Sequence, residues 1–76
     1  MFKEYIYLGH QTAPENQQIK VFVNLMTVYS FWRNPANGAV RIMGPGLGFD
    51  LYMTETQYDE FKLNMKTAAR LKHSYE

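Results

Sequence analysis

The absence of cysteine from so short a chain is the feature that most constrains its fold. A chain of 76 residues has room for a single domain, 1–76, and a domain of this size buries only a little over ~60% of the surface that it exposes when unfolded. Disulfides cannot add stability, and His10 and His73 are too few to form a zinc site. Self-association is the remaining ordinary source of burial for such a domain, so we expect a homo-oligomer.

The charges of the chain are nearly balanced. Eight Lys and Arg face seven Asp and Glu, which gives a net charge of +1, and this is too small for the broad positive surface of a nonspecific duplex binder. Residues Met1 to Glu4 carry both charge signs, and no long apolar run follows them. We therefore expect neither a secretory signal nor a membrane span, no membrane partner, and a cytoplasmic location.

Alternating apolar residues predict a small antiparallel sheet of about four to five strands within residues 2–54. The segments with this period of two are 2–8, 19–24, 27–32, 39–43 and 49–54. The adjacent apolar residues Leu25 and Met26 interrupt the alternation, which indicates a bulge or a tight turn near Asn24. Asn37-Gly38 readily adopts the positive φ of a hairpin turn, so the strands on either side of it should pair.

One amphipathic helix is predicted at residues 56–72, and the fold class is therefore α+β. Two residue pairs resemble the capping box that starts a helix, namely Thr56 with Asp59 and Thr54 with Gln57. Acidic residues near the start and basic residues near the end also suit the helix dipole.

The predicted helix has one face for the sheet and another that a monomer would leave exposed. Residues at helical spacing on the sheet-facing side are Tyr58, Phe61, Met65, Ala68 and Ala69. Leu63 lies about half a turn away from them, with Leu71 toward the same side. We expect Leu63 and Leu71 to form the oligomer interface.

Aromatic residues are too many for one small core to enclose. The chain has six Tyr, five Phe and Trp32, so some rings should lie at an interface or a ligand site. Trp32, Arg33 and Asn34 precede the hairpin, and Arg41 follows on the next strand, so these residues could stack a base and hold a phosphate. Alternatively, Trp32 caps the core and the arginines are ordinary surface residues.

A basic ridge is predicted on the helix. Lys62, Lys66 and Arg70 recur at i, i+4 and i+8, with His73 near the same side. Their mutual repulsion would be relieved by a bound anion or an acidic partner. The alternative is a solvated face whose positive charge complements the C-terminal end of the helix dipole.

We expect no enzymatic activity, because the chain lacks the side-chain patterns that catalysis requires. The glycine-rich segment 44–48 lies between two predicted strands without the lysine of a phosphate-binding loop, so it predicts a turn. Ser30 and Ser74 lie outside any nucleophile-elbow pattern. The sequence therefore predicts no catalytic residue, no cofactor and no metal site.

The pattern of apolar residues and turns between residues 19 and 65 resembles the small flagellar-operon proteins of the FlbD type. The matching features are Val21-Phe22-Val23-Asn24, Val28, Phe31, Asn37-Gly38, Val40 to Ile42, the glycine turn, Phe49 to Met53, and Glu55-Thr56 entering the helix. The resemblance implies a compact β-rich protein with an interaction role and no known chemistry.

Three functions are compatible with these features. The leading hypothesis is a non-enzymatic, oligomeric binding protein, such as a phage or accessory protein. It would sequester a small anionic, nucleotide-like ligand or block a host protein. A nucleic-acid-binding regulator that uses the basic ridge is the first alternative. A structural or flagellar-assembly accessory subunit is the second.

Overall fold

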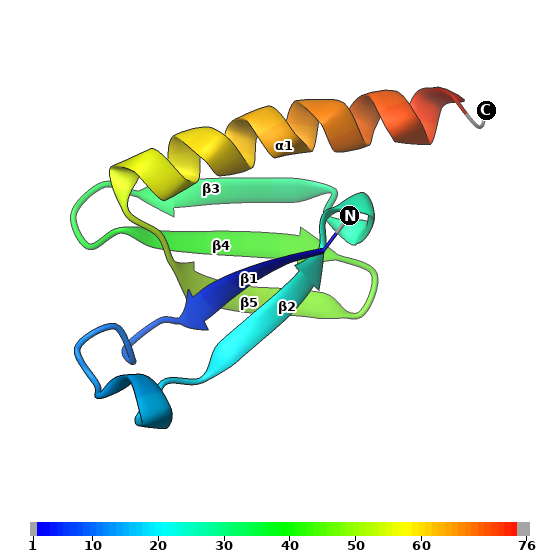
Figure 1. Cartoon of the computed structure of the whole chain (residues 1–76). Helices are drawn as coiled ribbons and strands as arrows, with labels where there is room; N and C mark the ends of the chain where they lie inside the picture. The colour runs from blue at the N-terminus through cyan, green and yellow to red at the C-terminus, as the bar shows by residue number, and fades with distance from the viewer. Residues whose placement is uncertain (1, 75–76) are drawn as a thin grey trace.

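The computed structural model describes residues 2–74, without the side chains of Leu47, His73 and Ser74. Within this range the chain forms a five-stranded sheet followed by one long helix, so the predicted α+β class is confirmed (Figure 1). The elements are β1 (Phe2–Tyr7), the 3-10 turn η1 (Glu15–Gln17), β2 (Lys20–Asn24), the 3-10 turn η2 (Leu25–Thr27), β3 (Ser30–Asn34), β4 (Ala39–Gly44), β5 (Leu47–Tyr52) and α1 (Glu55–Ser74).

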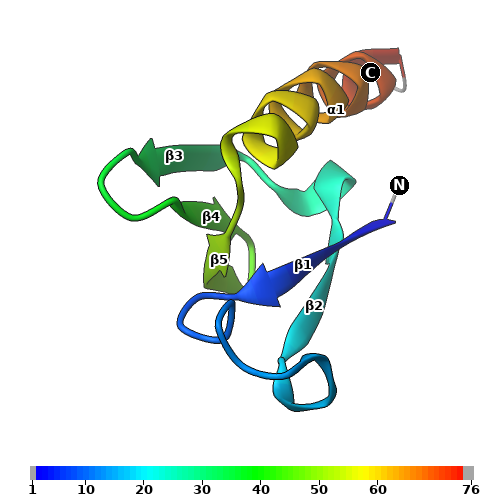
Figure 2. The same cartoon turned by 60° about the vertical axis from the view of Figure 1, so that its left-hand side comes forward.

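The sheet is antiparallel throughout, with strand order β2-β1-β5-β4-β3. Only two residue pairs, Ile6 with Tyr52 and Tyr7 with Leu51, join β1 to β5, whereas five pairs join β1 to β2. The sheet therefore consists of a β1–β2 ribbon and a β3–β4–β5 ribbon that meet over a short length. Figure 2 shows the two ribbons diverging, with α1 on the side toward which they open.

α1 closes the core between the two ribbons. The buried core residues are Tyr5, Val23, Leu25, Val28, Val40, Ile42, Leu51, Met53, Phe61 and Ala68. The Phe61 ring meets the edge of Tyr5 from β1 at 5.9 Å and of Phe31 from β3 at 4.9 Å between ring centres. One helical side chain thus contacts both ribbons, which ties the helix to each of them.

The sheet-facing side of α1 was predicted correctly except at its edge. Phe61 and Ala68 are fully buried, and Tyr58 and Met65 pack against the core. Ala69, expected on the same side, is exposed. Its side chain is rotated about 100° about the helix axis from that of Ala68, so it lies on a side of α1 that does not face the sheet.

The helix begins at Glu55, one residue before the predicted start, because Thr54 provides the cap. The Thr54 amide donates to Gln57 Oε1 at 2.9 Å, and the Gln57 amide donates to Thr54 Oγ1 at 3.2 Å. These reciprocal bonds form a capping box. The pair Thr54 and Gln57 is therefore the one that starts the helix, and Thr56 lies inside its first turn.

A helical turn, not a bulge, produces the predicted interruption near Asn24. The Asn24 side chain accepts a hydrogen bond from the Met26 amide at 3.1 Å and starts η2. η2 packs against α1, with the Leu25 side chain completely buried. The turn carries the chain from β2 at one edge of the sheet to β3 at the other.

Candidate functional site

A groove lies between α1 and the segment that runs from η2 into β3, and we call it the α1–β3 groove. Its volume is about 500 Å³. The lining residues are Val28, Tyr29, Phe31, Lys62, Met65, Lys66, Ala69 and Lys72. The helical members recur at three- and four-residue spacing, so one face of α1 supplies apolar walls and three ammonium groups.

Two of these lysines are held in place by their neighbours. Lys72 Nζ donates to the Val28 carbonyl oxygen at 2.8 Å and stands 4.5 Å from the centre of the Tyr29 ring. Lys62 Nζ lies 3.4 Å from Asp59 Oδ1 and 4.9 Å from the centre of the Tyr58 ring. The contact between Lys72 and Val28 joins the C-terminal part of α1 to the entry of β3.

The third lysine, Lys66, has no such contact. Among the described residues, no ion pair or hydrogen bond involves its ammonium group. Lys66 lies between Lys62 and Lys72 along the helix and lines the groove with them. The groove therefore combines an apolar lining with a positive charge that no carboxylate of the described chain neutralises.

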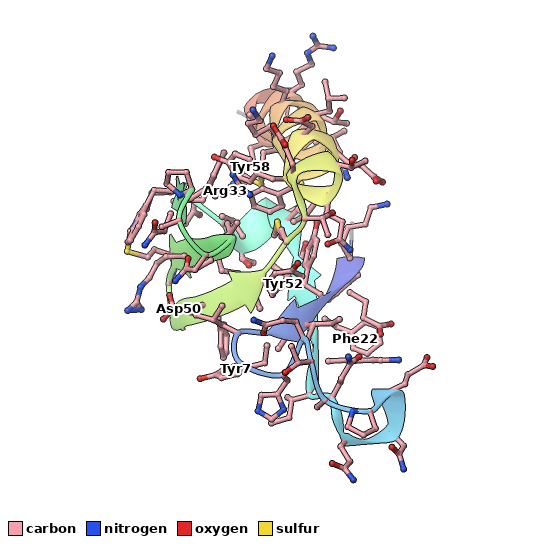
Figure 3. All side chains as sticks on the ribbon, turned by 90° about the vertical axis from the view of Figure 1, so that its left-hand side faces the viewer. Tyr7, Phe22, Arg33, Asp50, Tyr52 and Tyr58 are labelled. Carbon is pink, nitrogen blue, oxygen red and sulfur yellow. The ribbon has the colours of Figure 1, made fainter. Side chains whose placement is uncertain are left out.

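Arg33 extends the positive charge along β3. Its guanidinium carbon lies 5.6 Å from the centre of the Tyr58 ring, and its Nε is buried without a hydrogen-bond partner in the described chain. Figure 3 shows Arg33 and Tyr58 next to each other between the sheet and α1. A buried donor without a partner costs about 1–3 kcal/mol, so an acceptor at this position would be stabilising.

The structure brings together only part of the predicted Trp32 site. Trp32 and Arg41 are directly opposite each other in the β3–β4 register, and Arg41 Nε lies 3.1 Å from Asp50 Oδ1. Arg33 faces the other side of the sheet, because successive residues of a strand alternate between faces. The Asn34 side chain accepts a hydrogen bond from a backbone amide of the following turn at 3.0 Å.

The predicted basic ridge is divided in a similar way. Lys62 and Lys66 line the α1–β3 groove, whereas Arg70 is exposed and does not. The side chain of His73 lies outside the described residues. Leu63 is 64% exposed and Leu71 is 40% exposed, so the predicted exposure of both is confirmed.

Sequence reasoning missed Lys72 and Tyr29 as site residues. Helical spacing could have indicated Lys72, which follows Met65 by seven residues and so shares its face. No local pattern could have indicated Tyr29, because its place beside Lys72 depends on how η2 crosses the sheet.

Several rings are exposed, as their number predicted. Among the described residues, the aromatic side chains that are more than half exposed are Phe2, Phe22, Tyr29 and Trp32. Tyr29 borders the α1–β3 groove. Phe22 lies at the side of the sheet remote from α1, as Figure 3 shows.

Comparisons with known proteins do not indicate a function for this chain. No protein-family model, curated protein or solved structure matches the chain. The resemblance to FlbD-type proteins therefore stays a prediction.

In the described part of the chain, no group of three or more His, Asp or Glu side chains could hold a metal ion. None of its helices has the length and apolar character needed to cross a membrane.

Proposed function

We propose that this chain is a non-enzymatic binding protein that holds an anionic partner in the α1–β3 groove. The observation that supports this proposal best is that Lys66 makes no ion pair with a carboxylate of the described chain and lines the groove together with apolar side chains. A partner with an apolar body and an acidic group would match both features. Self-association and a cytoplasmic location stay predictions from the sequence.

The apolar lining and the positive charge have different roles in this proposal. Phe31, Met65 and Ala69 would lose solvent contact against the apolar part of the partner, which favours binding. Lys66 would pair with the acidic group, and a hydrogen bond to a charged group contributes about 1.5–3 kcal/mol. Because Lys72 and Tyr29 already contact each other, little ordering of that end of the groove is needed.

The arrangement favours such a partner over duplex nucleic acid. Duplex binding gains affinity from many phosphate contacts along a basic surface. Here Lys62 is close to Asp59, Arg70 does not line the groove, and the net charge is only +1. Among the described residues that line the groove, the Lys66 ammonium has no ion pair or hydrogen bond, which suits an acidic group on an apolar partner better than a run of phosphates.

Anilinonaphthalene sulfonate, an aromatic anion, is a suitable probe for the groove. We expect its fluorescence to rise on binding and Lys66→Glu to weaken the affinity about tenfold or more, equivalent to about 1.4 kcal/mol. Arg70→Glu is the matched control, because it makes the same charge change four residues away on the same helix. Phenylnaphthylamine, which lacks the sulfonate, should bind more weakly than the anion.

Two results would contradict the proposal. One is the absence of saturable binding by the wild-type protein. The other is an equal loss of affinity in Lys66→Glu and Arg70→Glu, which would assign binding to the general charge of the helix and support the basic ridge instead.

A further inference from the structure

β3 is an edge strand with an open side. It ends the strand order of the described sheet and pairs only with β4. β3 contains neither proline nor lysine, although these residues commonly protect exposed edges from further pairing. The edge strand therefore has backbone groups that another strand could use.

The hairpin geometry shows which backbone groups are available. The Asn34 carbonyl accepts a hydrogen bond from the Gly38 amide at 3.1 Å, so the backbone polar groups of Asn34 point toward the β4 side. In an antiparallel pair these groups alternate in direction from one residue to the next. The amide and carbonyl groups of Phe31 and Arg33 consequently point to the open edge.

α1 runs alongside this open edge in the opposite direction to β3. Contacts at both ends establish the alignment, with Lys72 bonded to Val28 near the start of β3 and Tyr58 beside Arg33 near its end. Figure 1 shows the helix following β3 along its length. The α1–β3 groove thus lies where an added strand would pass.

We propose that the open edge of β3 accepts an extended acidic peptide segment of a partner protein as an additional strand, with α1 beside it. This inference rests on the proposed function of the α1–β3 groove. The backbone of the segment would pair with Phe31 and Arg33, the recognition mode known as β-strand addition. Its carboxylates would be placed on the side that faces α1.

The spacing of the basic residues agrees with such a segment. Lys62 and Lys66 are four residues apart on a helix, which is a rise of roughly 6 Å. Side chains on one face of a strand repeat every two residues, or roughly 6.6 Å. A segment with acidic residues at alternate positions could therefore present one carboxylate to each lysine.

Arg33 adds selectivity for an acidic segment. An inward-pointing charge on an edge strand discourages pairing with apolar strands. Its buried Nε has no acceptor in the described chain, and a carboxylate of the incoming segment would supply one. The residue that disfavours an apolar strand would thus favour an acidic one.

Fluorescence polarisation with a labelled six-residue peptide of alternating Glu and Val tests the inference. We expect saturable binding, competition by anilinonaphthalene sulfonate, and at least a tenfold loss of affinity when Lys replaces each Glu. Lys66→Glu should weaken binding at least tenfold, and Arg70→Glu should change it less than threefold.

Backbone methylation of the peptide distinguishes strand addition from simple charge attraction. Two peptides carry methyl groups on alternate amides in the two possible registers, and both keep every side chain. Only one register should abolish binding, because a strand directs half of its amides to each neighbour. On binding, the Phe31 and Arg33 amides should gain at least tenfold protection from hydrogen exchange, whereas those of β2 should not.

The outcomes separate this inference from the proposed function. Equal binding of both methylated peptides, or protection of β2 amides in place of Phe31 and Arg33, would overturn strand addition. If the peptide fails to bind but the sulfonate binds in a manner that depends on Lys66, strand addition is wrong and the groove proposal stands. If neither probe binds, both are wrong.

Discussion

Phe61 is a fully buried core side chain that contacts aromatic rings from β1, β3 and α1. Its ring meets Tyr5, Phe31 and Tyr58 at 5.9, 4.9 and 6.4 Å between ring centres, and it is fully buried. Aromatic pairs of this kind add about 0.5–1.5 kcal/mol each beyond the area that they bury. One residue therefore stabilises contacts among β1, β3 and α1.

Phe61→Ala should lower the free energy of unfolding by about 3 to 5 kcal/mol, because it would leave a cavity between the two ribbons of the sheet. Urea unfolding followed by circular dichroism measures the change. Leu63→Ala, a truncation on the exposed side of the same helix, should cost far less. Near-wild-type stability of Phe61→Ala would show that the helix does not pack on the sheet as described.

Tyr5 makes stability depend on pH in the alkaline range. Burial, and to a lesser extent the negative charge of Glu60, raise the pKa of its hydroxyl from 10.0 to about 12. The folded protein therefore holds this proton more tightly than the unfolded chain. The resulting stability, about 2 to 3 kcal/mol, is fully present below pH 10 and is lost as the pH rises through 12.

Urea unfolding at pH 9 and at pH 12 measures this dependence. The loss of stability between the two pH values should be smaller in Tyr5→Phe than in the wild type, because the variant has no proton to lose at this position. Tyr29→Phe, which changes an exposed ring, should behave like the wild type. The same decline in Tyr5→Phe and in the wild type would show that Tyr5 does not cause it.

At the scale of single elements, α1 depends on the bonds at its first turn. The capping box of Thr54 and Gln57 satisfies two backbone amides, each of which donates to the side-chain oxygen of the other residue. Thr56, the other candidate from the sequence, is exposed within the first helical turn. The sequence is compatible with a cap at either Thr54 or Thr56, and the hydrogen bonds in the structure identify Thr54 as the cap.

Thr54→Ala should destabilise the protein by about 1 kcal/mol, the usual cost of removing a helix cap. Thermal unfolding monitored at the far-ultraviolet helix signal measures the difference. Thr56→Ala is the control and should change stability by less than half as much. A larger effect of Thr56→Ala would indicate that the helix begins two residues later than described.

At the scale of the whole molecule, the two ribbons meet through only two residue pairs between β1 and β5. α1 adds a further contact between them through Phe61, which meets Tyr5 of β1 and Phe31 of β3. A domain of this size has a small core, and no disulfide reinforces it. The exposed Leu63 gives the molecule an apolar position at which a second copy could add burial.

Leu63→Glu should convert a multimer at micromolar concentration into a smaller and less stable species, because it would place like charges in a contact between copies. Sedimentation velocity measures the size. The melting temperature should rise with protein concentration only in the wild type. Ile19→Glu is the matched control, since Ile19 is about half exposed on the opposite part of the fold.

A wild-type protein that sediments as a monomer at every concentration would exclude this interface. In that case the predicted homo-oligomer must be abandoned. The groove proposal would be unaffected, because every residue that lines the α1–β3 groove belongs to one chain.

The sequence by itself determined the elements whose signals are local. Alternation over a few residues indicates a strand, and the Asn37-Gly38 turn has Gly38 at φ +72°, a conformation open mainly to glycine. The spacing of Phe61, Met65 and Ala68 indicated the buried side of α1. Each of these features depends on neighbours close in sequence, so no knowledge of the full fold was needed.

Only the tertiary structure decided the strand order and, with it, the candidate site. Lys72 and Val28 are 44 positions apart, yet they share a hydrogen bond, because η2 carries the chain to the far edge of the sheet. The same crossing places Phe31 opposite α1, and strand alternation then separates Arg33 from Trp32. A groove between distant segments arises from how the elements pack, and packing among several amphipathic surfaces is not encoded in any one of them.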